Sequence, residues 1–233
     1  DAWDPLDYGK AYDWNTPFFQ QYHKLMQDVP WPSRSIESIK NSPYCNNVTS
    51  INNCYLVFGS LNTEDSYYSF GLSGAKNIYD CNYIYDSELN FQSVYNHKCY
   101  RAFYSHHCRG CLDVYFCRYS ANLANCFGCI GLKNKSYCVF NKQLSRQGYE
   151  KFIAEANLGS YAQIHTWQTD MQKFSAAFPR KYSWNSNTVS TSGEYISNSK
   201  NVVHSYFVDG GENIKYGYFL YGSAKDSYDY FRF

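Results

Sequence analysis

Small and aliphatic side chains recur at every third position through much of this chain. Between Ser35 and Lys142, 36 positions are multiples of three, and 32 of them carry Ala, Cys, Ser, Thr, Val, Ile or Leu. None is aromatic, although 20% of the whole chain is. The exceptions are Asn90, Asn96, Lys135 and Asn141. The ten cysteines share this phase: Cys45, Cys54, Cys81, Cys99, Cys108, Cys111, Cys117, Cys126, Cys129 and Cys138.

A longer period of twelve residues lies above the three-residue period. Aromatic residues return at this spacing and form what we call the aromatic row: Tyr55, Tyr67, Tyr79, Phe91, Phe103, Tyr115 and Phe127. A three-residue period belongs to neither a helix nor an ordinary strand. It is expected of a chain that turns a corner every three residues, with one side chain pointing inward and two outward. Four such sides close a coil, and stacked coils pair in parallel at about 4.7–4.9 Å.

The pattern therefore predicts a mainly β fold, a narrow parallel β-solenoid with 12-residue coils, interrupted by an α-helical insert and preceded by a short N-terminal helix. We expect four parts: an N-terminal helical cap over 1–34, about nine coils over 35–142, the helical insert over 143–185, and a second solenoid segment of about four coils over 186–233.

The predicted helices have recognisable starts. Ser145 and Ser160 precede the two helices of the insert as N-caps, and Pro17 precedes the N-terminal helix. The N-terminal helix has a face of aromatic and aliphatic residues. We expect that face to cover the first coil, because the open ends of solenoids need caps.

After the insert the three-residue pattern returns in a new phase. The predicted inward sites are Ile196, Ser199, Val202, Ser205, Val208, Gly211, Ile214, Gly217 and Leu220. Charged residues fall at the inward phase of the last coil, namely Asp226, Asp229 and Arg232. We therefore expect this coil to be open or to act as a cap.

Composition narrows the classes of function. The 233 residues carry a net charge of +1 and 18% charged residues, which argues against a strongly basic nucleic-acid binder. The aromatic content argues against disorder, and no run of 18 or more apolar residues predicts a membrane span. The sequence begins without Met or a signal-peptide pattern, so we expect a fragment or a processed product; its localisation remains unknown.

The cysteines have three possible roles: a metal site, disulfides, or compact filling of the interior. The third is favoured, so no metal or cofactor is expected. The Cys108-x2-Cys111 and Cys126-x2-Cys129 spacings resemble those of zinc sites, but a gap of two follows from the coil itself. Stacked cysteines have Cα atoms inside the 4.4–6.8 Å window of a disulfide. Compact apolar filling of the interior is the favoured interpretation. The candidates for a disulfide or thiol ladder are Cys99, Cys111, Cys117, Cys129, Cys126 and Cys138.

A family resemblance rests on several short motifs. They are Trp3-Asp4-Pro5-Leu6-Asp7-Tyr8-Gly9, Asn53-Cys54-Tyr55, Asp65-Ser66-Tyr67-Tyr68, Asn125-Cys126-Phe127-Gly128-Cys129, Leu158-Gly159-Ser160-Tyr161 and Lys225-Asp226-Ser227-Tyr228-Asp229-Tyr230. With them the chain resembles a family of Cys-, Tyr- and Asn-rich repeat proteins from uncultured candidate-phyla bacteria. The coil plan also resembles the 12-residue β-solenoid of beetle antifreeze proteins. The resemblance implies a repeat architecture and no particular reaction.

The outer surface suggests the function. Rings spaced along a parallel sheet stabilise it, and an exposed row of rings also suits a partner. We therefore expect a non-enzymatic structural or binding scaffold that presents the aromatic row for protein–protein interaction or self-association. The alternative is a carbohydrate-binding protein that uses the same Tyr/Phe wall. No phosphate-binding loop or carboxylate pair is recognisable, and Cys108 points inward while His106 and His107 point outward, so no catalytic residue is expected.

Overall fold

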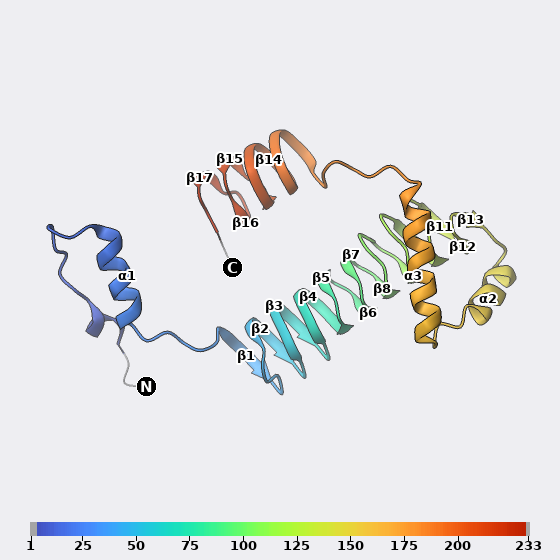
Figure 1. Cartoon of the computed structure of the whole chain (residues 1–233), viewed down its shortest axis with the longest axis horizontal. Helices are drawn as coiled ribbons and strands as arrows, with labels where there is room; N and C mark the ends of the chain where they lie inside the picture. Colours follow the sequence, from blue (N-terminus) through green and yellow to red (C-terminus); the bar gives the residue numbers. More distant parts are fainter. Residues whose placement is uncertain (1–3, 232–233) are drawn as a thin grey trace.

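The computed structural model describes residues 4–231. Trp3 of the first motif, and Arg232, predicted at an inward site of the last coil, lie outside the described residues. The fold is mainly β, with two parallel sheets and three α-helices in the described part (Figure 1). The helices are η1 (Pro5–Tyr8, a 3-10 turn), α1 (Phe18–Asp28), α2 (Arg146–Glu155) and α3 (Tyr161–Ala176).

The first sheet contains strands β1 to β13 and the second contains β14 to β17. The strands of the first sheet are β1 (Ile36–Lys40), β2 (Asn46–Asn52), β3 (Tyr55–Glu64), β4 (Tyr67–Tyr79), β5 (Asn82–Tyr85), β6 (Glu88–Phe91), β7 (Val94–His97), β8 (Tyr100–Phe103), β9 (Leu112–Tyr115), β10 (Ala121–Phe127), β11 (Lys133–Ser136), β12 (Cys138–Val139) and β13 (Lys142–Gln143). The strands of the second sheet are β14 (Ser186–Asp209), β15 (Glu212–Lys215), β16 (Tyr218–Tyr221) and β17 (Lys225–Tyr228).

Parallel pairs in the first sheet join residues that are twelve apart. Ile36 pairs with Val48, and Val48 pairs in turn with Ser60. The same offset joins Ala121 to Lys133 near the far end of the sheet. The pairing is therefore β-helix-like: each strand contacts the strand one period further along the chain.

The three-residue period has a backbone cause. The residue before each inward site adopts a left-handed conformation, as at Asn53 (φ 53°), Asp65 (φ 49°) and Asn77 (φ 54°). This conformation turns the chain, and among non-glycine residues Asn and Asp tolerate it best. The corners therefore account for many of the 21 asparagines in this chain.

The inward phase forms the core. Ile51, Ile78 and Val114 are 2%, 0% and 0% exposed, whereas Lys76 and Asn122, which occupy outward positions, are exposed. The predicted alternation is confirmed at these sites. The interior is narrow and close-packed, which explains why it holds no ring.

Two of the polar exceptions in the inward phase satisfy each other inside the first segment. Asn96 Nδ2 donates a hydrogen bond to Asn90 Oδ1 (3.1 Å), and Asn96 Oδ1 accepts one from the backbone N–H of Cys108 (3.1 Å). A third exception, Asn141, closes the last coil, since its side chain donates to the carbonyl of Ile130 and accepts from its N–H. Buried amides are stable only with such partners.

The second sheet follows the predicted phase up to its last coil. All nine predicted inward residues, from Ile196 to Leu220, are buried. The last coil is longer by one residue, because Glu212 pairs with Lys225 and Ile214 pairs with Ser227. The predicted inward placement of Asp226 and Asp229 is therefore wrong: the extra residue shifts both to left-handed corners, at φ 49° and 50°.

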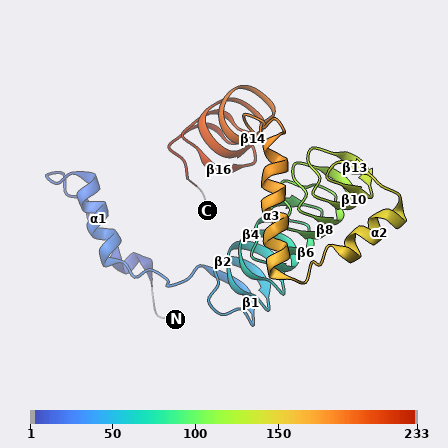
Figure 2. The same ribbon diagram turned by 45° about the vertical axis from the view of Figure 1, so that its right-hand side comes forward.

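The insert closes one end of the first sheet. Ser145 accepts a hydrogen bond from the N–H of Gly148, and Ser160 accepts one from Gln163, so both predicted N-caps are present. Helices α2 and α3 pack at the end of the sheet where β12 and β13 lie (Figure 2).

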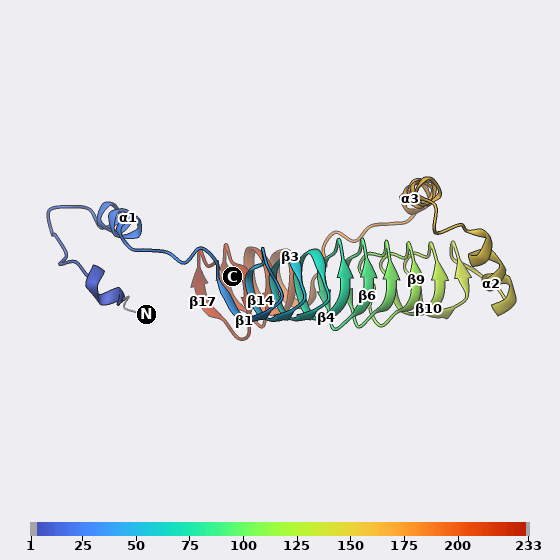
Figure 3. The same ribbon diagram turned by 90° about the horizontal axis from the view of Figure 1, so that it is seen from below.

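Helix α1 does not cover the first coil, so that part of the predicted N-terminal cap is wrong. None of its residues is buried, and Phe19 is 80% exposed. The N-terminal region is instead held to itself: Lys10 forms an ion pair with Asp28, and Gln21 bonds to the backbone of Asp13. An extended linker joins it to β1, and α1 stands away from the sheets (Figure 3).

Candidate functional site

The aromatic row is only in part an open surface. Tyr79 is 38% exposed, whereas Phe127, at the end of the row, is fully buried. The Phe127 ring lies edge-on to Phe152 of α2 (5.0 Å between centroids) and to Trp167 of α3 (5.1 Å). Tyr67 stacks on Tyr79 at 5.1 Å. The row therefore stabilises the sheet, and the insert covers its C-terminal end.

The other residues of the row are half-buried and pack on neighbouring rings. Phe103 stacks on Tyr115 at 5.3 Å, and Phe91 lies edge-on to Tyr104 at 5.4 Å. Tyr55 meets Tyr68 in the same edge-on manner at 5.7 Å. Rings from the adjacent position of each coil thus interleave with the row, so it does not form one continuous stack.

All ten cysteines are buried and are free thiols in this structure. The stacked candidates Cys99 and Cys111, Cys117 and Cys129, and Cys126 and Cys138 line the interior of the first segment as thiols. Burial raises the pKa of Cys81 to about 12, and burial also raises the pKa of Cys54. A thiolate is the reactive form, so these two side chains are poor nucleophiles.

A second set of rings joins the two sheets. Tyr83, Tyr95, His107 and Tyr119 form a column at corners of the first segment, each twelve residues from the next. Tyr83 stacks on Tyr95 at 4.8 Å and Tyr95 on His107 at 4.9 Å between centroids, while Tyr119 lies tilted against His107 at 5.3 Å. We call these four residues the first ring column.

The facing column comes from the second segment and its linker, and consists of Trp184, Tyr195, Phe207 and Phe219. Tyr95 stacks on Tyr195 at 4.5 Å, and Tyr83 stacks on Phe207 at 5.5 Å. His107 stacks on Trp184 at 4.6 Å. Because later residues of the first column meet earlier residues of the second, the second segment runs back along the first in the opposite direction.

The histidine in this stack is held neutral. Burial between the rings lowers the pKa of His107 to about 4, with the adjacent His106 as the second cause. Burial also lowers the pKa of His106 to about 4, with the Arg118 charge as the second cause. A neutral imidazole stacks in an apolar environment without the cost of burying a charge.

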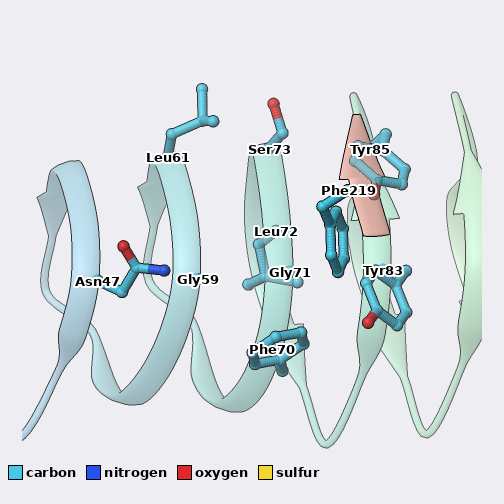
Figure 4. Close-up of a pocket in the computed structure, with 10 residues that line it drawn as sticks. All are labelled: Asn47, Gly59, Leu61, Phe70, Gly71, Leu72, Ser73, Tyr83, Tyr85 and Phe219. Carbon is cyan, nitrogen blue, oxygen red and sulfur yellow. The ribbon is translucent and has the colours of Figure 1, made fainter. Parts of the chain in front are cut away.

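The ring columns end at a groove. Past Tyr83 the corner positions of the first segment hold Gly71, Gly59 and Asn47, which have no ring. A cavity of about 360 Å³ lies there (Figure 4). Its lining comprises Asn47, Gly59, Leu61, Phe70, Gly71, Leu72, Ser73, Tyr83, Tyr85 and Phe219. We call it the glycine groove.

Two glycines keep the groove open. Gly71 has φ +71°, and a Cβ there would lie 2.8 Å from Cδ1 of Tyr83. Gly59 has φ +59°, and its Cβ would lie 3.2 Å from Cε2 of Phe70. Both sites are left-handed corners against which a ring of the next coil packs, so a larger residue would displace that ring.

The chemistry of the groove is apolar, with a few neutral polar groups. None of its ten lining residues is charged. Phe70, Tyr83 and Phe219 contribute ring surfaces, while Asn47 and Ser73 contribute an amide and a hydroxyl group. Ligand sites combine apolar walls with a few polar groups in this way, in cavities of about 300–1,000 Å³.

The sequence did contain a signal for these columns. Tyr83, Tyr95, His107 and Tyr119 are equally spaced, and Tyr195, Phe207 and Phe219 repeat at the same interval. The spacing alone does not indicate that the two rows face each other. The groove depends on both rows, and so it was not predicted.

Within 4–231, no group of three or more His, Cys, Asp or Glu side chains is arranged to hold a metal ion. In the same part of the chain, no helix has the length and apolar character needed to cross a membrane.

No family model matches this chain, and no curated protein matches it. Among solved structures, it is similar to a protein assigned as an acetyltransferase from Desulfovibrio desulfuricans, with TM-score 0.16 and 10% identity over 76% of this chain and 52% of that chain. A protein with the same assignment from Bacillus cereus has TM-score 0.18 and 11% identity over 63% and 96% of the two chains. A hexapeptide transferase family protein from Anaplasma phagocytophilum has TM-score 0.16 and 8% identity, over 62% and 93%.

These findings correct the expected function. The neighbours are described as transferases, so the prediction of a non-enzymatic scaffold, with carbohydrate binding as its alternative, is not upheld and is withdrawn. The covered end of the aromatic row also removes part of the surface on which that prediction depended. Likeness at this level carries no reaction over to this chain.

Proposed function

We propose that this chain is a β-solenoid of 12-residue coils whose two segments together form a binding site for a small, neutral, planar aromatic molecule. The twelve-residue offset of the strand pairs supports the coil length. The resemblance to Cys-, Tyr- and Asn-rich repeat proteins of candidate-phyla bacteria implies the same plan. The glycine groove at the end of the two ring columns is the observation that carries the binding site.

The geometry favours a flat ligand. The two columns stack rings at spacings between 4.5 and 6.2 Å and end with Tyr83 and Phe219 at the mouth of the groove. Offset stacking of aromatic rings contributes about 0.5–1.5 kcal/mol beyond the burial of area. A planar molecule in the groove would stack against Tyr83 or Phe219, the last rings of the two columns, and so continue the stack.

The polar groups favour a neutral ligand with one or two hydrogen-bonding substituents. Among the described residues, the lining has no Lys, Arg, Asp or Glu to pair with a charged group, and a charge placed in an apolar site without a partner is costly. Asn47 and Ser73 lie on the groove and provide neutral hydrogen-bonding groups.

Three matched probes test the ligand class by calorimetry: β-naphthol, its saturated analogue decahydronaphthol, and naphthalene sulfonate. We expect β-naphthol to bind and the other two to bind at least about tenfold more weakly. Decahydronaphthol cannot stack on the rings, and naphthalene sulfonate brings a charge into the groove. Equal affinity for the naphthol and its saturated analogue would contradict the stacking site.

Two tryptophan variants test the location of the site. Leu61 lines the groove and is 46% exposed, so Leu61→Trp should fill the groove and abolish β-naphthol binding while the fold is kept. Leu112 is 44% exposed and does not line the groove, so Leu112→Trp is the matched control and should bind as the wild type does. Unchanged binding by Leu61→Trp would show that the site lies elsewhere.

A further inference from the structure

Within residues 4–231, no strand covers the first coil of the first sheet or the last coil of the second sheet, and these two open coils lie at the same end of the molecule with opposite chain polarity. The first sheet begins there with β1, and the second sheet ends there with β17 (Figure 3). This placement follows from the ring columns, which show that the second segment runs back along the first. One exposed coil is therefore the start of a segment, and the other is the end of a segment.

The opposite ends of both segments are closed. At the far end of the first sheet, β13 turns back antiparallel onto β12, and Gln143 Nε2 donates a hydrogen bond to the carbonyl of Ser136. The first coil of the second sheet is closed by Asn185, whose side chain bonds to the carbonyl of Gly193 and the N–H of Ile196. The two ends of the molecule therefore differ in their capacity to add a strand.

Large apolar side chains are exposed on the open coils. Ile36 and Tyr44, in the first coil, are 38% and 66% exposed. Tyr228 and Phe231, in the last coil, are 63% and 57% exposed. Helix α1, whose aromatic face was expected to cover the first coil, stands away from it. Strand edges with exposed apolar residues are typical sites of association between chains.

We propose that a second copy of this chain covers the open end, in a two-fold symmetric dimer. Across such an axis, the first coil of each copy meets the last coil of its partner. The chain direction across the contact is then the parallel one that already joins every pair of neighbouring coils in both sheets. Both open coils of both copies are covered at once.

The closed far ends limit the assembly to two copies. A repeat protein with both ends open could add copies indefinitely, whereas an isologous contact through one end leaves no further edge to pair. The geometry therefore indicates a discrete dimer and no filament. The dimer does not require a ligand in the glycine groove.

Sedimentation equilibrium on the whole chain, from micromolar to millimolar concentration, tests the proposal. We expect a mass of twice the 27.2 kDa monomer. Ile36→Lys and Tyr228→Lys place a charge on each of the two open coils, and each should raise the dimer dissociation constant about tenfold or more. Tyr161→Lys is the matched control: Tyr161 is 87% exposed on α3, and its variant should dimerise as the wild type does.

Several outcomes would overturn the proposal. A wild-type monomer at every concentration would exclude the dimer, and assemblies larger than two copies would exclude the closed geometry. Phe19→Lys on α1 should leave the dimer intact. If it abolishes the dimer while Tyr228→Lys does not, the helix forms the interface and the open coils do not. Circular dichroism of each variant checks that a lost dimer is not a lost fold.

Discussion

Inward serines tie neighbouring coils together through their hydroxyl groups. Ser105 Oγ donates to the carbonyl of Phe103 (3.0 Å) and accepts from the N–H of Cys117 (3.1 Å), twelve residues on. Ser66 repeats the pattern, with the carbonyl of Glu64 and the N–H of Ile78. The hydroxyl thus satisfies backbone groups that the corners remove from the strand ladder.

Cysteine occupies the same phase for a related reason. Cys117 Sγ contacts the carbonyls of Tyr115 (3.5 Å) and Cys126 (3.6 Å), so the thiol is a weak donor to the same kind of backbone group. It also fills more of the interior than a hydroxyl does. Ser and Cys are thus alternative solutions for one inward environment, which explains why both recur in it.

Ser105→Ala tests this role at the scale of one residue. Removing the Ser105 hydroxyl leaves the buried N–H of Cys117 without its side-chain acceptor, and an unsatisfied buried polar group costs about 1–3 kcal/mol. We expect a decrease of that size in the free energy of unfolding, measured by urea denaturation. Ser73→Ala, at an outward position, is the control and should change stability by less than about 0.5 kcal/mol. Equal effects of the two variants would contradict the role given to inward hydroxyls.

At the scale of elements, the insert and the sheet form one packed unit. Phe116, Phe127 and Ile130 of the first segment pack with Tyr149 of α2 and Ile164 of α3. Trp167 Nε1 also donates to the carbonyl of Ala156 (2.9 Å), which fixes α3 against the end of α2. The covered end of the aromatic row is therefore part of a core, while its exposed end is not.

Phe127→Ala and Tyr79→Ala separate these two environments. Phe127 is 0% exposed, and removing a fully buried ring typically costs about 3–5 kcal/mol. Tyr79 is 38% exposed and belongs to the same row, so its replacement should cost clearly less. Thermal and urea denaturation measure both. If the two variants lost equal stability, the insert would contribute little to the packing of the row.

At the scale of the whole molecule, the first and second segments are joined through aromatic rings. Contacts between the columns, such as Tyr95 with Tyr195 and Tyr83 with Phe207, hold the second segment against the first. The Tyr195 hydroxyl also approaches Nε2 of His107 at 3.5 Å. The glycine groove exists only while the segments are docked, because Phe219 belongs to the second segment and most of the lining to the first.

The docked state should weaken in acid. His107 has a folded-state pKa of about 4 and an ordinary value of 6.5, so the unfolded or undocked chain binds a proton that the stack excludes. The stability that the neutral His107 contributes is fully present above pH 6.5 and should decrease as the pH falls from 6.5 towards 4. Melting temperatures across this range measure the effect.

His107→Phe is the matched variant for this experiment. It keeps a ring in the column and removes the titrating group, so its melting temperature should fall less between pH 6.5 and 4 than that of the wild type. His106 still titrates in the variant and accounts for a residual slope. An identical pH profile for both proteins would show that the stack does not exclude the proton.

Much of the fold could be predicted from the sequence, because its period is local. The inward phase at Ile51 or Val114 is set by corners that recur every three residues, and a few neighbours determine each corner. The caps at Ser145 and Ser160 are likewise short-range hydrogen bonds. Local rules of this kind do not depend on how the rest of the chain folds.

Other features could not be predicted, for equally physical reasons. A single extra residue between β16 and β17 moves Asp226 from an inward site to a corner, and no periodic rule states where an insertion falls. The position of α1 depends on whether its own ion pair and hydrogen bonds or the first coil provides better partners. The sequence pattern contains both possibilities.

The amino-acid sequence by itself determined the three-residue period, the inward phase of the cysteines and serines, and the helical insert, since each depends mainly on residues close together in the sequence. Only the tertiary structure decided that Tyr83, Tyr95 and His107 face Tyr195, Phe207 and Trp184, and that a groove lies where the facing columns end. Two rows with the same spacing can pair in either direction and in several registers. The direction depends on how the helices α2 and α3 return the chain, and that is a property of the whole molecule.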